Sequence, residues 1–99
     1  MKKTICIIGG TQQLTINKLG VKKGFNILFH DGRVRGGGNK STFLKLVQQS
    51  NCVIVLSGAC SHESMWLIKD LCKRYNVPIH FQPGRGISGA INQAALLCS

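Results

Sequence analysis

The sequence predicts a small α/β domain of Rossmann-like type, with a four-stranded parallel sheet in the order 2-1-3-4 and helices on both faces. Two observations predict this class. Short apolar runs alternate four times with segments of helical periodicity. The links between them are short, which implies parallel strands joined by right-handed crossovers. The length of 99 residues fits one domain, which we expect to span residues 1–99.

The first strand is expected at Ile5–Ile8, because a wholly apolar run is typical of a strand buried on both faces. It ends in Gly9–Gly10, a turn in which the backbone can approach a ligand closely. Thr11 can then cap a short helix that continues to about Leu19, and we expect Gly20 to end it.

The second strand is expected at Phe25–Phe29 and is ended by His30–Gly32. A basic, glycine-rich loop, Arg33–Gly38, leads to a helix capped by Asn39 or Ser41. The apolar side of this helix consists of Phe43, Leu46 and Val47.

The third strand, Cys52–Leu56, has the clearest pattern of the four. Ser57–Cys60 leads out of it, and Ser61 is the expected cap of the third helix. Apolar residues recur along that helix at the spacing of one face: Met65, Ile68, Leu71, Cys72 and Tyr75.

The last strand is expected at Val77–Phe81, and Pro78 favours an edge position or a strand start. Pro83–Gly86 then turns into a final helix. One side of this helix carries Ile87, Ile91, Ala94 and Cys98.

The charge indicates an anionic partner. Thirteen Lys and Arg residues face three acidic residues, which gives a net charge of +10. Such a surface attracts phosphorylated ligands and nucleic acid. Aromatic residues are few and do not interleave with basic ones, so nucleic acid would be held through its backbone.

The cysteines predict a reducing compartment. The five cysteines contain no Cys-x-x-Cys pair, and Cys6, Cys52 and Cys72 fall in apolar positions, as core thiols do. No apolar run approaches the roughly 20 residues needed to cross a bilayer. We therefore expect a cytoplasmic protein that does not contact the membrane.

Ligands of open parallel sheets bind at the carboxyl ends of the strands, where the strand order reverses. Two loops are expected to meet there, Gly9–Thr11 and Ser57–His62. The first is not a Gly-x-Gly-x-x-Gly fingerprint, and Arg33–Thr42 is not a P-loop, because Asn39 separates the glycines from Lys40. NAD binding and NTPase activity are therefore disfavoured, although both segments suit phosphate contact.

His30, Cys60 and His62 are expected near the same edge and allow several interpretations. They can be structural, they can hold zinc or haem iron, or Cys60 can be a nucleophile with His62 as its base. An enzyme that acts on a phosphorylated substrate would use His62 or Asp31 as acid–base. His80, in the expected edge strand, is interpreted as structural.

Four motifs resemble a bacterial family, the domain of unknown function 2325. They are Ile7–Gly10, His30–Gly32, Ser61–His62 and Lys69–Arg74. The resemblance covers nearly the whole chain and implies a small Rossmann-like fold, but no established activity. The family pattern differs at Ala59–Cys60 and at the glycines of 36–38, so the resemblance implies no role for Cys60.

The first hypothesis is therefore a non-enzymatic binding module for a nucleotide or nucleic acid, with the metal or haem module and the enzyme as alternatives. A domain this small can gain stability by pairing, so we expect a homodimer. The predicted ligand-binding residues are Gly9, Gly10, Thr11, His30, Asp31, Arg33, Arg35, Lys40, Ser61, His62, Lys69 and Arg85.

Overall fold

The computed structural model describes residues 3–10, 13–31, 40–83 and 87–98. The strands are β1 (Thr4–Ile8), β2 (Asn26–His30), β3 (Cys52–Leu56) and β4 (Ile79–Gln82). The helices are α1 (Gln13–Lys22), α2 (Lys40–Gln49), α3 (His62–Tyr75) and α4 (Ile87–Cys98), with a short 3-10 turn, η1 (Ser57–Ala59), after β3.

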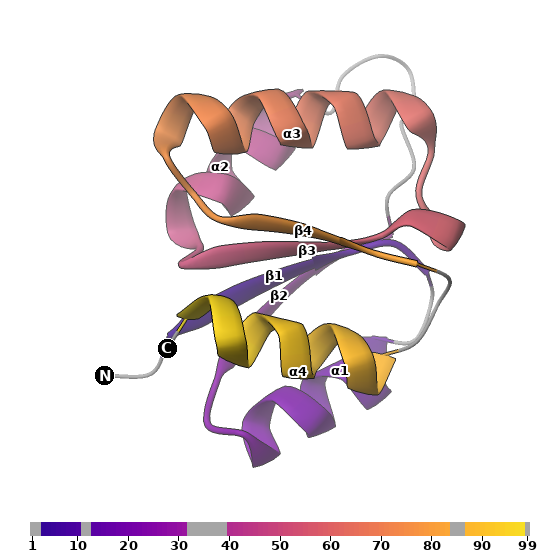
Figure 1. The fold of residues 1–99 in the computed structure, drawn as a ribbon, viewed down its shortest axis with the longest axis vertical. Helices are drawn as coiled ribbons and strands as arrows, with labels where there is room; N and C mark the ends of the chain where they lie inside the picture. The colour runs from indigo at the N-terminus through magenta and orange to yellow at the C-terminus, as the bar shows by residue number, and fades with distance from the viewer. Residues whose placement is uncertain (1–2, 11–12, 32–39, 84–86, 99) are drawn as a thin grey trace.

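The strands form one parallel sheet in the order β2-β1-β3-β4, with α1 and α4 on one face and α2 and α3 on the other (Figure 1). This arrangement confirms the predicted fold class and strand order. The central strands are apolar on both sides because each side meets a helix layer. Ile5 and Ile7 of β1 pack with α1 and α4, whereas Cys6 and Ile8 pack with α2 and α3.

The edge strands begin one or two residues later than predicted, because the preceding helices use the backbone of those residues. The Phe25 N–H donates to the Gly20 carbonyl at 2.9 Å, and the Val77 N–H donates to the Cys72 carbonyl at 2.9 Å. Asn76 is left-handed, with φ 60°, and ends α3. Pro78 has no N–H to donate to the sheet.

Three predictions about the helices were wrong. Ser41 is not the cap of α2, because the helix already includes Lys40; Asn39 lies outside the described residues. Tyr75 is not part of the buried face of α3, because it lies beyond the apolar cluster and is 46% exposed. Gly20 does not end α1, which continues to Lys22.

Gly20 is needed within α1 because the helix approaches β2 closely there. A Cβ at Gly20 would overlap the Cγ1 and Cδ1 atoms of Ile27. The missing side chain therefore allows α1 to lie against the sheet, and the turn to β2 is made at Gly24 instead, with φ 84°.

Gly20→Ala should lower the free energy of unfolding by about 1–3 kcal/mol, because Ile27 must leave its position to make room. Gly89→Ala in α4 is a matched control, since its Cβ meets mainly the flexible amide end of Gln82, at 2.9 Å. It should be neutral or should stabilise by up to about 1 kcal/mol through helix propensity. Urea denaturation of both variants checks this, and equal effects would contradict the close packing of α1.

Candidate functional site

All four strands end at one edge of the sheet, and all four helices begin there (Figure 1). We call this the carboxyl edge. β1 lies between β2 and β3, so the strand order reverses between β1 and β3. Gly9 follows β1 and Ser57 follows β3, so the two loops predicted to meet do follow neighbouring strands. Ligands of open parallel sheets bind at such a position.

The turn after β1 has a backbone that only glycine adopts readily. Gly9 has φ 117° and Gly10 has φ 84°. The Gly9 N–H donates to the His30 carbonyl at 2.8 Å, which ties the ends of β1 and β2 together. Gly10 then follows with no side chain to block a ligand.

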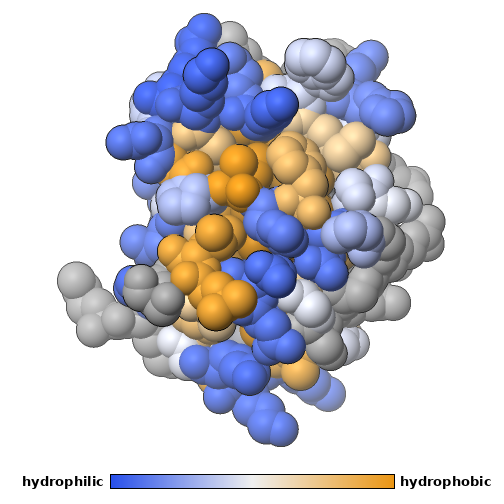
Figure 2. Space-filling view, viewed as in Figure 1, coloured by the Kyte–Doolittle hydropathy of each residue, from blue (hydrophilic) through white to orange (hydrophobic). Residues whose placement is uncertain are grey.

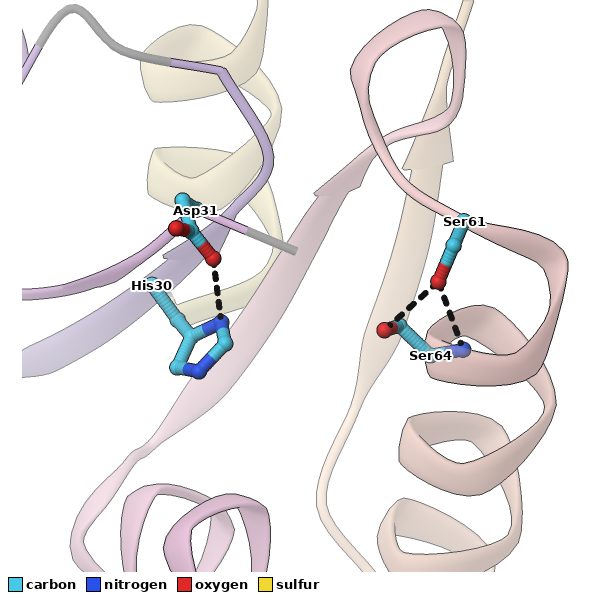
Figure 3. Close-up of polar contacts among 4 residues, drawn as sticks. All are labelled: His30, Asp31, Ser61 and Ser64. Carbon is cyan, nitrogen blue, oxygen red and sulfur yellow. Dashed lines mark hydrogen bonds and ion pairs between the residues drawn. The ribbon is translucent and has the colours of Figure 1, made fainter. Parts of the chain in front are cut away.

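His30 and Asp31 form a pair at the end of β2 (Figure 3). The His30 Nδ1 lies 3.5 Å from the Asp31 Oδ1. The imidazole ring also packs edge-on against Phe43 of α2, with 4.6 Å between ring centroids. His30 is only 17% exposed and Asp31 is 33% exposed, so packing fixes the histidine while the carboxylate remains accessible.

Ser61 caps α3, as predicted, and acts together with Ser64 (Figure 3). The Ser61 Oγ accepts from the Ser64 N–H at 3.2 Å, and the Ser61 hydroxyl donates to the Ser64 Oγ at 2.8 Å. Ser64 is fully buried. Sequence reasoning missed Ser64, although its spacing of three residues from a helix cap was the available signal.

Cys60 connects the loop after β3 to the end of β2. The pKa of its thiol is raised from 9.0 to about 11, mainly by burial; a hydrogen bond with Ser64 opposes this rise, and the negative charge of Asp31 contributes to it. The influence of Asp31 indicates that Cys60 lies near the end of β2. A thiol with this pKa is protonated at neutral pH, so the structure gives no support to Cys60 as a nucleophile.

The alternative metal ligands His30, Cys60 and His62 are not brought together as one group. Within residues 3–10, 13–31, 40–83 and 87–98, no three His, Cys, Asp or Glu side chains are grouped so that they could hold an ion. His30, Cys60 and His62 all belong to these ranges. His62 is exposed at the start of α3, and His80 in β4 contacts Gln82, with 3.2 Å between Nε2 and Oε1.

The predicted basic residues are only partly located. Lys40 begins α2 at the carboxyl edge, whereas Lys69 lies on the exposed side of α3, two turns from His62. Lys69 is therefore not grouped with the loop residues. Four predicted residues lie outside the described ranges: Thr11, Arg33, Arg35 and Arg85.

Lys69 instead lines a shallow groove of about 310 Å³ between α3 and β4, together with Met65, Trp66 and Phe81. Trp66 is 75% exposed. Trp66 was not among the predicted site residues. Its position in the sequence lies off the buried face of α3, and this was the available signal of its exposure. None of the helices in the described part of the chain is long and apolar enough to cross a membrane.

Comparison with known proteins supports the resemblance inferred from the motifs. A family model described as "Uncharacterized protein conserved in bacteria (DUF2325)" matches residues 4–96. A UPF0751 protein of Bacillus cereus (strain AH820) is 38% identical over 88 residues, covering 89% of this chain and 88% of the relative. A UPF0751 protein of Desulfitobacterium hafniense (strain DSM 10664 / DCB-2) is 40% identical over 94 residues, covering 92% and 91%.

No solved structure matches the chain significantly. The family match nevertheless covers the whole sheet, from β1 to β4, and both loops at the point where the strand order reverses. The Gly9–Gly10 turn, the His30–Asp31 pair and the Ser61 cap therefore all lie within the matched region. The chain thus belongs to the bacterial DUF2325 family, which includes the UPF0751 proteins.

Proposed function

We propose that this protein is a non-enzymatic binding module for a phosphate-bearing ligand, a nucleotide or a nucleic acid, held at the carboxyl edge. One observation carries the proposal: α1, α2 and α4 begin at this edge with no acidic residue in the first turn. A helix start has unpaired N–H groups and a partial positive charge, which acidic side chains commonly neutralise. A bound phosphate would take their place.

The distribution of acidic residues supports this proposal. On α3, the Asp70 Oδ2 lies 3.4 Å from the Arg74 Nε, and Glu63 lies in the first turn of the same helix. The start of α3 is therefore partly neutralised by its own glutamate. Asp31 is paired with His30. The excess of thirteen basic over three acidic residues then leaves the protein strongly attractive to anions.

The predicted site residues have separate roles in this proposal. Gly9, Gly10 and Thr11 contact the phosphate through their backbone. Asp31 directly follows β2, which is where dinucleotide-binding folds place the acid that accepts a hydrogen bond from a ribose hydroxyl. The charge is supplied by Arg33, Arg35, Lys40 and Arg85, and the ligand is oriented by His30, Ser61 and His62.

Binding is favoured over catalysis because the cysteine thiol near the site is not activated as a nucleophile. The Cys60 thiol is protonated at neutral pH because burial raises its pKa to about 11. Of the chain's three acidic residues, only Asp31 directly follows a strand at this edge, and it is already engaged with His30. The His30–Asp31 pair could exchange a proton with a substrate, but the neighbouring Cys60 thiol is not activated as a nucleophile, which favours binding over catalysis.

Isothermal titration calorimetry with adenosine triphosphate and with a hexanucleotide tests the proposal. The triple variant Arg33→Ala, Arg35→Ala, Arg85→Ala should bind each ligand at least about 100-fold more weakly, since a hydrogen bond to a charged group contributes about 1.5–3 kcal/mol. Binding of the hexanucleotide by the unchanged protein should weaken steeply with salt.

The matched control removes the same number of positive charges from a helix segment that leads away from the carboxyl edge. Lys18, Lys22 and Lys23 lie on or directly after α1, towards its carboxyl end. Their triple alanine variant should lose less than about fivefold in affinity, because charges far from the ligand act only through the screened field of the protein. Equal losses in the two triple variants would show that only net charge matters and would overturn a specific site at the carboxyl edge.

A further inference from the structure

The side of α3 that faces solvent presents a regular row of side chains. His62, Trp66, Lys69 and Lys73 follow one another at intervals of four, three and four residues, so they share one face of the helix. All four are exposed. We call this row the α3 stripe. It begins at the carboxyl edge and extends for about 16 Å along the helix, at about 1.5 Å per residue.

The groove described above lies beside the middle of the α3 stripe. Its lining combines the half-buried side chains of Met65 and Phe81 with the exposed side chains of Trp66 and Lys69. Figure 2 shows that apolar residues gather on the face where β4 lies between α3 and α4, and that hydrophilic residues border them. β4 is an edge strand of the sheet in the described part of the chain.

We propose that the groove and the α3 stripe bind a short single-stranded nucleic acid, with one base stacked on Trp66 and its phosphates on Lys69 and Lys73. The proposal extends the carboxyl-edge site and rests on the proposed function, because His62 joins the two. A track of about 16 Å suits roughly five stacked nucleotides at about 3.4 Å each.

Chemical complementarity favours nucleic acid over other occupants. Proteins that bind single strands combine a basic groove with exposed aromatic rings, because every base has a flat face that can stack. Lys69 and Lys73 recur once per helical turn, which suits a strand with regularly spaced phosphates. A second copy of the chain is disfavoured in the groove, because Lys69 and Lys73 beside it would face the same lysines of the other copy and repel them.

The fluorescence of Trp66 reports directly on the groove, because it is the chain's one tryptophan. Titration with hexameric oligothymidylate or oligouridylate should quench its emission, and adenosine triphosphate should quench it much less. Affinity should rise with oligonucleotide length to about five or six nucleotides, the length of the track. A preference between the two hexamers identifies DNA or RNA as the ligand, and both outcomes support the proposal.

Variants are compared by the anisotropy of a fluorescein-labelled hexanucleotide. Trp66→Ala should weaken binding about 5- to 150-fold, the range expected for loss of one base–aromatic stack of about 1–3 kcal/mol. Trp66→Tyr should restore most of the affinity. The double variant Lys69→Ala, Lys73→Ala should bind more weakly, and its slope of log affinity against log salt concentration should fall by the amount expected for about two phosphate contacts. The double variant Lys18→Ala, Lys22→Ala should show neither change.

The outcomes separate this inference from the proposed function. If Trp66→Ala leaves hexanucleotide binding unchanged while the arginine triple variant abolishes it, the α3 stripe is not the track and the carboxyl-edge site stands. If adenosine triphosphate and hexanucleotides both fail to bind the unchanged protein, both proposals fall. Saturable quenching by an acidic peptide but not by hexanucleotides, or dimerisation that Trp66→Ala abolishes, would overturn the nucleic-acid assignment.

Discussion

Phe43→Ala should lower the free energy of unfolding by about 3–5 kcal/mol, a loss at the upper end of what one core substitution causes. The Phe43 side chain is fully buried between α2 and the sheet. Its removal leaves a cavity that the surrounding β-strand residues cannot easily fill. Because a domain of this size is stable by only about 5–15 kcal/mol, the variant should lose much of its margin.

Phe43→Leu separates packing from the aromatic contact with His30. Leucine retains most of the buried volume, so stability should fall by only about 1–2 kcal/mol, while the edge-on contact with the imidazole is lost. Lys45→Ala, at an exposed position of α2, serves as the control and should change stability by less than about 0.5 kcal/mol. Urea denaturation measures all three, and a Phe43→Ala loss below about 1 kcal/mol would contradict the packing of α2.

Stability should fall steeply as the pH rises above about 9, because buried thiols resist ionisation. The pKa of Cys6 is raised from 9.0 to about 12, mainly by burial and also by Cys72, against the opposing effect of a hydrogen bond with Ser50. Burial likewise raises the pKa values of Cys60 and Cys72 to about 11. In the unfolded chain these thiols ionise near pH 9, whereas in the folded protein they remain protonated.

The sign of this effect follows from proton linkage. Below about pH 9 both states hold the thiol protons, so stability is unaffected by them. Between about pH 9 and 12 the folded state holds more protons than the unfolded state, so stability falls as the pH rises. The deeply buried Cys6 should contribute a slope of about 1.4 kcal/mol per pH unit.

Cys6→Ala provides the test. The variant should be less stable than the unchanged protein at pH 7 because it leaves a cavity, yet its stability should fall more gently between about pH 9 and 11. Urea denaturation at several pH values, with a phosphine reductant present, measures both slopes. Parallel curves for the two proteins would show that the Cys6 thiol is not protected from ionisation.

The fold could be predicted largely from patterns that burial imposes. Cys52–Leu56 was predicted with its observed bounds, because a strand covered on both faces must be apolar throughout. Gly20 was misinterpreted because its role is a contact with Ile27, which lies on another element. A local signal for a helix end cannot distinguish this case from a close approach between α1 and the sheet.

The candidate site could be predicted less completely. The turn at Gly9–Gly10 and the cap at Ser61 follow from local backbone requirements, and the structure places both at the carboxyl edge. The groove beside Trp66 depends on the packing of α3 against Phe81 of β4, which no linear motif records. The roles of Arg33, Arg35 and Arg85 remain predictions, because these residues lie outside the described ranges.

The central claim is that a phosphate-bearing ligand binds at the carboxyl edge of the sheet. The most direct test is a titration of isotope-labelled protein with adenosine triphosphate, followed through the backbone amide resonances. We expect saturable shifts at Gly9, Gly10 and Asp31, with little change at Gly24 and Asn51 near the opposite edge. Shifts centred on Gly24 and Asn51, or no saturable shift at any amide, would contradict it.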